Sequence, residues 1–134
     1  QNAKKSSTQP SKQKILIADD SVYIRLSLHQ MLSRAGYSVA EARDGMEVLE
    51  QLLENAPNLL LLDIEMPNLN GYDLLNIIRA LPASPELAKL KIVMLTSRSS
   101  PKHQQRSREL GAHAYLTKPS PQDVMLGTIS ALLQ

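Results

Sequence analysis

Five short apolar runs, separated by segments with helical periodicity, constrain the fold of this chain more than any other feature. The runs predict strands at residues 14–18, 37–42, 58–63, 91–96 and 113–117. Helices are expected at 21–35, 44–55, 70–81, 100–111 and 120–133, with a short helical turn at 85–89. Strands joined by helical crossovers form a parallel sheet with helices on both faces. We therefore predict an α/β fold with a five-stranded, doubly wound parallel sheet in the flavodoxin-like order 2-1-3-4-5.

Capping residues indicate where several of these helices begin and end. Gly36 is expected to adopt a positive φ just after the first helix, because glycine has no Cβ to clash there. Asp44 is expected to cap the second helix, since Glu47 follows three residues later and can complete a capping box. The same role is expected of three further residues: Asn70, Ser100 and Ser120. Each of the two serines precedes a proline, which suits the first helical turn.

The first thirteen residues differ in composition from the rest of the chain. They contain Lys4, Lys5 and Lys12 but no acid, and their polar character is typical of disordered linkers. Removing these three lysines from the 15 basic residues leaves 12 against 13 acidic residues, so the net charge changes from +2 to −1. A basic tail can contact nucleic acid, but a linker is the simpler interpretation. We predict a disordered polar linker or tail at 1–13, one folded domain at 14–134, and no direct binding of nucleic acid.

The composition also disfavours several classes of protein. The absence of cysteine excludes disulfides, thiolate metal sites and cysteine nucleophiles. No apolar run reaches the roughly 18 residues of a membrane helix and the sequence starts with polar residues, so neither membrane insertion nor a signal peptide is expected. A cytoplasmic location is therefore expected. The three histidines, His29, His103 and His113, lack metal-binding spacing and are expected at the surface or in helix packing.

Polar side chains follow most of the predicted strands at their carboxyl ends. In a parallel sheet these ends share one edge, where ligands bind. The residues expected to meet there come from the first, third, fourth and fifth strands: Asp19, Asp20, Asp63, Glu65, Thr96, Ser97 and Lys118. Glu41, on the second strand, is expected at the edge of the sheet instead. The sequence therefore predicts one pocket that collects three aspartates, a hydroxyl and an ammonium group.

Such a pocket predicts a divalent cation and phosphoryl chemistry. Two carboxylates about 4 Å apart repel by roughly 4 kcal/mol at an effective dielectric constant near 20, and Lys118 supplies too little charge for three of them. Oxygen ligands without histidine or cysteine favour Mg²⁺ or Mn²⁺. An aspartate beside such an ion, a lysine and a hydroxyl is suited to accept a phosphoryl group, with Asp63 as the nucleophile.

Each of these residues also has a simpler structural interpretation when taken alone. Asp20 can be the N-cap of the following helix. Thr96 can be an ordinary β-branched residue at the end of a strand, and Lys118 can be a solvated surface charge. The functional interpretation depends on their convergence.

Four segments together resemble the receiver domain of two-component response regulators: ILIADDS (15–21), LLLLDIEMPNLNGYDLL (59–75), IVMLTS (92–97) and AYLTKP (114–119). The resemblance covers about residues 14 to 133. It implies that Asp63 is the phosphoacceptor and that Mg²⁺ is held by Asp20 directly, by Asp19 through water, by Asp63, and by the backbone carbonyl of Glu65. It also implies that Lys118 pairs with a phosphoryl oxygen.

The resemblance further implies a switch. Thr96 would bind the phosphoryl group after transfer and Tyr115 would turn inward as Thr96 moves, although Tyr115 can also simply fill space on its strand. Glu65 and Arg98 match positions that tune the dephosphorylation rate, and we hypothesise that they pair as ions and hinder the attacking water. Ser120 stands where many members have phenylalanine, which affects the packing of the last helix.

The function implied is that of a phosphoacceptor in a phosphorelay, with self-catalysed phosphotransfer and autodephosphorylation. The donor would be a phosphohistidine on a histidine kinase or a histidine phosphotransfer domain. A downstream protein would bind the face formed by helix 100–111, strand 113–117 and helix 120–133. The segment DDSVYIRLSL is similar to receivers of chemotaxis-type hybrid histidine kinases, so the C-terminal part of such a kinase is the first expectation for context and a free-standing regulator the second.

Two other classes of protein remain possible from the residues. A haloacid-dehalogenase-like phosphatase also uses an aspartate at a strand end, but its second acid, two residues later, should be Asp, where this chain has Glu65. A flavodoxin-like cofactor carrier would need a phosphate-binding loop after the first strand, and the acidic ADDSVYI segment repels a phosphate. Turnover of small phosphate esters would favour the first, and a bound flavin the second.

Overall fold

The computed structural model describes residues 12–67, 69–82, 84–97 and 101–134. The strands are β1 (Lys14–Ala18), β2 (Ser38–Ala42), β3 (Leu59–Asp63), β4 (Lys91–Thr96) and β5 (Ala114–Thr117). The helices are α1 (Val22–Arg34), α2 (Gly45–Glu54), α3 (Gly71–Ala80), α4 (Pro85–Lys89), α5 (Pro101–Glu109) and α6 (Gln122–Leu132). The predicted elements are all present, with bounds that differ by at most two residues.

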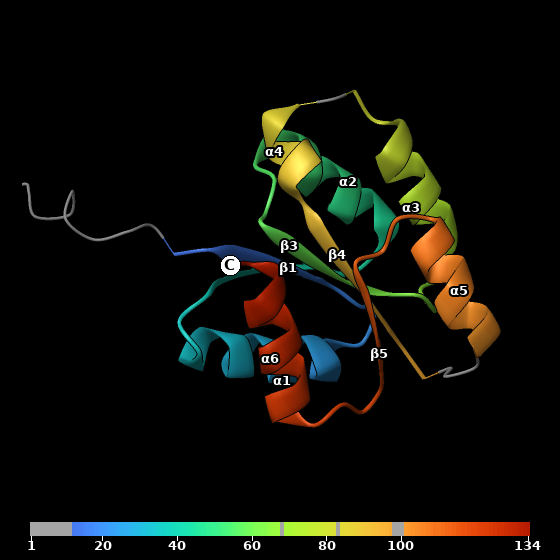
Figure 1. The fold of residues 1–134 in the computed structure, drawn as a ribbon. Helices are drawn as coiled ribbons and strands as arrows, with labels where there is room; N and C mark the ends of the chain where they lie inside the picture. Colours follow the sequence, from blue (N-terminus) through green and yellow to red (C-terminus); the bar gives the residue numbers. More distant parts are fainter. Residues whose placement is uncertain (1–11, 68, 83, 98–100) are drawn as a thin grey trace, which may run out of the picture.

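The five strands form one parallel sheet in the order β2-β1-β3-β4-β5. Figure 1 shows α1 and α6 on one face of this sheet, and α2, α3 and α5 on the other. This arrangement confirms the predicted doubly wound fold. It also places the carboxyl ends of β1, β3, β4 and β5 next to one another along one edge.

The leucines of β3 explain why this central strand is apolar throughout. Leu59 and Leu61 pack with α1 and α6, whereas Leu60 and Leu62 pack with α2 and α3 on the opposite face. All four are at most 1% exposed. Burial of each leucine side chain contributes about 2 kcal/mol, so the strand is firmly anchored on both faces just before Asp63.

The helix caps agree with the prediction in most places. Gly36 has a φ of +101° at the end of α1. The side chains of Asp44 and Asn70 accept hydrogen bonds from the backbone N–H groups of the third helical residues of α2 and α3. Ser100 lies outside the described residues.

The predicted cap at Ser120 is wrong. Its hydroxyl donates to the backbone carbonyl of Thr117 at the end of β5, and Pro121 occupies the N-cap position without a side-chain hydrogen bond. A residue before proline is disfavoured from helical geometry, so α6 begins later, at Gln122. Among the described residues, no helix is long and apolar enough to span a bilayer.

Candidate functional site

Three aspartates meet at the carboxyl edge of the sheet. Asp19 follows β1 and is 1% exposed, Asp63 ends β3 and is 2% exposed, and Asp20 lies at the surface. One carboxylate oxygen from each lies within 4.8 Å of the other two. The convergence that the strand pattern predicted is therefore present, with Asp63 more than forty positions along the chain from the adjacent pair Asp19 and Asp20.

The loop after β3 is held close to Asp63 by its own backbone. The amide of Gly71 donates to the carbonyl of Ile64 at 2.9 Å, and a Cβ on Gly71 would lie 2.8 Å from Ile64 Cα and 3.1 Å from the carbonyl oxygen of Asp63. Only glycine fits this approach. The amide of Glu65 donates to Asp63 Oδ1 at 3.0 Å, which fixes the orientation of the Asp63 carboxylate.

Lys118, just after β5, connects two of the acids. Its Nζ lies 2.7 Å from Asp19 Oδ2 and 3.2 Å from Asp63 Oδ1. Burial alone would lower the pKa of Lys118, but the hydrogen bond to Asp19 and the charge of Asp63 raise it above its ordinary value. Burial raises the pKa of Asp63, and the charge of Asp19 adds to this, while the Glu65 amide and Lys118 act in the opposite direction.

Asp20 is not the cap of the following helix. Ser21 occupies the N-cap of α1, where its Oγ accepts a hydrogen bond from the backbone N–H of Ile24 at 3.2 Å. The backbone N–H of Ser21 donates to Asp19 Oδ1 at 2.9 Å. The simpler interpretation of Asp20 is therefore wrong, and its carboxylate is available to the acid cluster.

Thr96 is completely buried at the end of β4, and its hydroxyl donates to Glu65 Oε1 at 3.0 Å. Ser97 also contacts this carboxylate, with its backbone N–H at 3.1 Å and its hydroxyl at 2.8 Å from Oε1. Sequence reasoning assigned Glu65 only a backbone role at the metal and a place opposite Arg98. It missed these contacts, because nothing in the spacing shows which way the side chain turns.

The other candidate residues that the structure describes lie outside this cluster. Tyr115 is half-buried on β5 and packs against the core on the α2 and α3 face, and Arg98 lies outside the described residues. His29 bonds to Glu41 at 2.7 Å, and His103 to the Tyr72 hydroxyl at 2.9 Å. The third histidine, His113, accepts a hydrogen bond from the Ile92 amide at 3.1 Å. His29 and His103 lie in helices and His113 is exposed, which agrees with the surface or helix-packing roles expected for the histidines.

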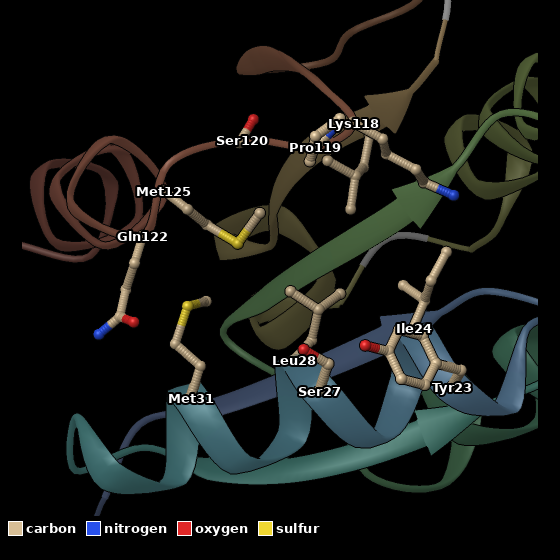
Figure 2. Close-up of a pocket in the computed structure, with 11 residues that line it drawn as sticks. Tyr23, Ile24, Ser27, Leu28, Met31, Lys118, Pro119, Ser120, Gln122 and Met125 are labelled. Atoms are coloured by element: carbon tan, nitrogen blue, oxygen red, sulfur yellow. The ribbon is translucent and has the colours of Figure 1, made fainter.

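An apolar cleft of about 400 Å³ lies beside the site, between α1 and α6. Figure 2 shows Met31 of α1 and Met125 of α6 pointing toward one another across it. Lys118 and Pro119 line one end, so the lysine borders both the cleft and the acid cluster. No local pattern in the sequence indicates this cleft, because its two walls come from opposite ends of the chain.

The donor set fits a hard divalent cation. The cluster has three carboxylates and one ammonium within contact distance of two of them, so most of its negative charge is uncompensated within the described residues. Carboxylate oxygens are the ligands that Mg²⁺ prefers in proteins, usually one or two of them with water. Such an ion would be held by Asp19, Asp20 and Asp63.

Comparison with known proteins identifies the family. Residues 15–130 match the family described as Response regulator receiver domain. The chain is 39% identical over 121 residues to Response regulator MprA of Mycobacterium leprae, covering 90% of this chain and 51% of that protein. It is 35% identical over 105 residues to a Gliding motility regulatory protein of Myxococcus xanthus, covering 78% of this chain but only 13% of that protein. The chain thus spans about half or less of these curated relatives.

Solved structures show the same fold. The chemotaxis protein CheY4 of Vibrio cholerae superimposes with a TM-score of 0.84 at 30% identity, with 92% of this chain and 100% of that chain covered. The signal receiver domain of a signal transduction histidine kinase from Syntrophus aciditrophicus superimposes with a TM-score of 0.79 at 31% identity, with 90% and 89% covered. Sequence, fold and acid cluster lead to one conclusion: this chain belongs to the response regulator receiver domain family of two-component signalling.

Proposed function

We propose that Asp63 accepts a phosphoryl group from a phosphohistidine on a histidine kinase or a histidine phosphotransfer domain. The observation that carries this proposal is the contact of the buried Asp63 carboxylate with Lys118 at 3.2 Å, within 4.8 Å of the oxygens of Asp19 and Asp20. A carboxylate in this setting faces both an ammonium group and a cation site. It is therefore placed where negative charge on incoming phosphoryl oxygens can be offset.

In the transfer, an Asp63 carboxylate oxygen forms a bond to phosphorus while the bond between phosphorus and the donor imidazole nitrogen breaks. The electron pair of that bond stays on the nitrogen, so the donor leaves as free imidazole. Lys118 pairs with a phosphoryl oxygen, and Mg²⁺ (or Mn²⁺), when bound by Asp19, Asp20, Asp63 and the backbone carbonyl of Glu65, offsets the remaining charge. Asp19 fixes Lys118 through their 2.7 Å contact.

The output of the domain is a changed protein-binding surface. Phosphorylation adds about −1.5 to −2 charges, which attract the Thr96 hydroxyl away from Glu65 and toward Asp63. Tyr115 then turns inward on the neighbouring strand, and the face formed by α5, β5 and α6 changes its affinity for a downstream protein. The support for this step is that Thr96 is buried at the end of β4, with a hydroxyl that already makes an exchangeable hydrogen bond to a carboxylate.

The lifetime of the phosphorylated state is proposed to depend on Glu65 and Arg98. The resemblance to receiver domains implies that these two positions flank the path of the attacking water, and pairing of the two side chains as ions would hinder that water. The supporting observation is that the Glu65 carboxylate already turns toward Thr96 and Ser97 at the end of β4, on the side from which Arg98 follows in the sequence. Because the Glu65 carboxylate is engaged by Thr96 and Ser97, this orientation does not favour its use as the second acid of a haloacid-dehalogenase-like phosphatase.

The donor is proposed to contact the domain beside α1. Three apolar side chains at the start of this helix are exposed, Val22 by 70%, Tyr23 by 80% and Leu26 by 54%. Tyr23 also lines the cleft between α1 and α6 (Figure 2). A donor protein that buries these side chains would bring its phosphohistidine to the acid cluster, which lies at the adjacent sheet edge.

The parent protein is proposed to be a hybrid sensor histidine kinase with this domain in its C-terminal part, located in the cytoplasm. The likeness to the receiver domain of a histidine kinase from Syntrophus aciditrophicus supports this context. The alternative is a free-standing regulator, which the full coverage of CheY4 supports.

Intact-mass measurement after incubation with acetyl phosphate and Mg²⁺ tests the phosphoacceptor. The wild-type protein should gain the mass of one phosphoryl group, and the gain should disappear when Mg²⁺ is chelated. Asp63→Asn should gain none, because an amide is not a nucleophile here. A phosphoryl adduct on Asp63→Asn, or none on the wild-type protein, would contradict the proposal.

A further inference from the structure

Arg25, on the first turns of α1, reaches two elements of the sheet at once. Its Nη1 donates to the backbone carbonyl of Asp19 at 2.6 Å, and its Nε donates to Glu41 Oε1 at 3.1 Å. The arginine side chain is 13% exposed. Glu41 is the acid at the end of β2 that the phosphoryl chemistry does not use. Its own position is fixed, since its second oxygen bonds to His29 at 2.7 Å and its carbonyl accepts from Gln51 at 2.8 Å.

The carbonyl of Asp19 belongs to the peptide that joins Asp19 to Asp20. Asp19 itself is held at three other points: its N–H by the carbonyl of Ala42, and its two carboxylate oxygens by Ser21 and Lys118. The carboxylate of Asp20, in contrast, makes no hydrogen bond within the described part of the chain and lies at the surface. Its direction toward the cluster is therefore set by the peptide before it, which Arg25 fixes.

We propose that Arg25 is a positioning residue for the cation site, which acts by fixing the Asp19–Asp20 peptide so that both carboxylates face Asp63. Glu41 is the anchor for the guanidinium, and it offsets part of the positive charge that Arg25 brings near a cation site. The inference rests on the proposed function, because it assumes that the three aspartates bind a divalent ion.

An arginine suits this position because the guanidinium presents Nε and Nη1 in a rigid fork, so one side chain can bond the carbonyl just after β1 and a carboxylate on β2. A lysine at the same position has a single nitrogen at the end of a flexible chain. It can keep the charge but holds the two acceptors less firmly.

Substitutions of Arg25 distinguish a positioning role from a purely electrostatic one, because the two predict opposite changes in Mg²⁺ affinity. Removal of a positive charge near the site should strengthen Mg²⁺ binding if charge alone matters. If Arg25 positions the ligands, Arg25→Gln should weaken Mg²⁺ binding, by about ten-fold on the scale of other residues that support metal ligands. Arg25→Lys keeps the charge, so charge alone predicts no change, whereas loss of positioning predicts a several-fold weakening.

The measurement is a Mg²⁺ titration of the whole chain, at constant ionic strength, followed by backbone amide chemical shifts. Arg34→Gln, which removes an exposed arginine from the last turn of the same helix, is the matched control and should bind Mg²⁺ as the wild-type protein does. If Arg25→Gln does not fold, as judged by the dispersion of its amide shifts, the Mg²⁺ affinity of Arg25→Lys decides between the two roles.

Three results would overturn the inference. Mg²⁺ affinity in a folded Arg25→Gln that equals or exceeds the wild-type value contradicts positioning. So does an unchanged affinity in Arg25→Lys. Failure of the wild-type protein to bind Mg²⁺ at the aspartates is a different result, because it would overturn the proposed function and the role of Arg25 with it.

Discussion

The carboxyl ends of β1 and β4 lie on either side of β3 and its Asp63, and their side chains are held in different ways. At the β1 end, Asp19 is bonded through its backbone and both carboxylate oxygens to groups from β2, α1 and the segment after β5. At the β4 end, the hydroxyls of Thr96 and Ser97 donate to one carboxylate, that of Glu65. A hydroxyl that donates to a side-chain carboxylate can exchange that acceptor for a phosphoryl oxygen, whereas Asp19 cannot move without breaking several hydrogen bonds.

The different ways in which side chains are held at the two ends suit two different functions along one sheet edge. An ion site benefits from ligands that are fixed before the ion arrives. A switch needs a contact that a change in charge can replace. We infer that the β1 end holds the ion and the β4 end acts as the switch. Two further measurements test that division, and a third tests a group distant from both ends.

The largest expected effect is on stability, from Lys118→Met. This change leaves Asp19 and Asp63 as two buried acids without their shared cation, so we expect the free energy of unfolding to fall by about 2 kcal/mol at neutral pH. Saturating Mg²⁺ should recover much of the loss, because the ion supplies positive charge to the same oxygens. Urea unfolding with and without Mg²⁺ measures both quantities.

Lys89→Met, at an exposed position of α4, is the control for Lys118→Met and should change stability very little. A loss in Lys118→Met no larger than in this control would show that the β1 end does not depend on the lysine. A loss of stability that saturating Mg²⁺ does not reduce would show that the ion does not bind beside Asp19 and Asp63.

An intermediate effect is expected at the β4 end, from Glu65→Ala. Removal of the carboxylate takes one acceptor from the Thr96 hydroxyl and is proposed to open the path of the attacking water, so the acyl phosphate on Asp63 should decay several-fold faster. Arg98→Ala should act in the same direction if the two residues pair. Decay after removal of acetyl phosphate, followed by intact mass, gives the rates.

Glu50→Ala, on the exposed face of α2, controls for the loss of a carboxylate distant from the β4 end. Equal lifetimes in the wild-type protein, Glu65→Ala and Arg98→Ala would remove the proposed role of both residues. Fold stability should change little in Glu65→Ala, which would distinguish this end of the site from the β1 end.

The smallest effect is expected at the opposite edge of the sheet, at His113. Partial burial and the charge of Lys91 lower the pKa of His113 below its ordinary value of 6.5. The unfolded chain therefore takes up this proton first, so stability is lost as the pH falls below about 6.5. His113→Asn keeps an acceptor for the Ile92 amide and should reduce that loss of stability only slightly, because the ring is largely solvated.

Urea unfolding of His113→Asn and the wild-type protein between about pH 7.5 and about pH 5 tests the sign. Mg²⁺ affinity should be the same in both proteins, because His113 precedes β5 and Lys118 follows it. A steeper loss of stability at low pH in His113→Asn would contradict the assigned protonation.

Local patterns predicted the elements well and the contacts between side chains only in part. The apolar runs and caps identified the strands and most helix starts. The predicted cap at Ser120 was wrong, because its hydroxyl donates to the Thr117 carbonyl and not to the helix it precedes. The acid cluster was predictable because parallel strands bring their ends to one edge. The contact of Glu65 with Thr96 was not, since a side chain's rotamer depends on neighbours from distant strands.

The sequence by itself determined the order of strands and helices, and with it the edge where Asp19, Asp20, Asp63 and Lys118 meet. It could do so because hydrophobic periodicity is a local property and the handedness of strand–helix–strand connections restricts the topology. Only the tertiary structure decided that Arg25 holds the Asp19 carbonyl, that Glu65 holds Thr96, and that a cleft opens between α1 and α6. These contacts join groups from separate elements, and they depend on packing distances that no local pattern encodes.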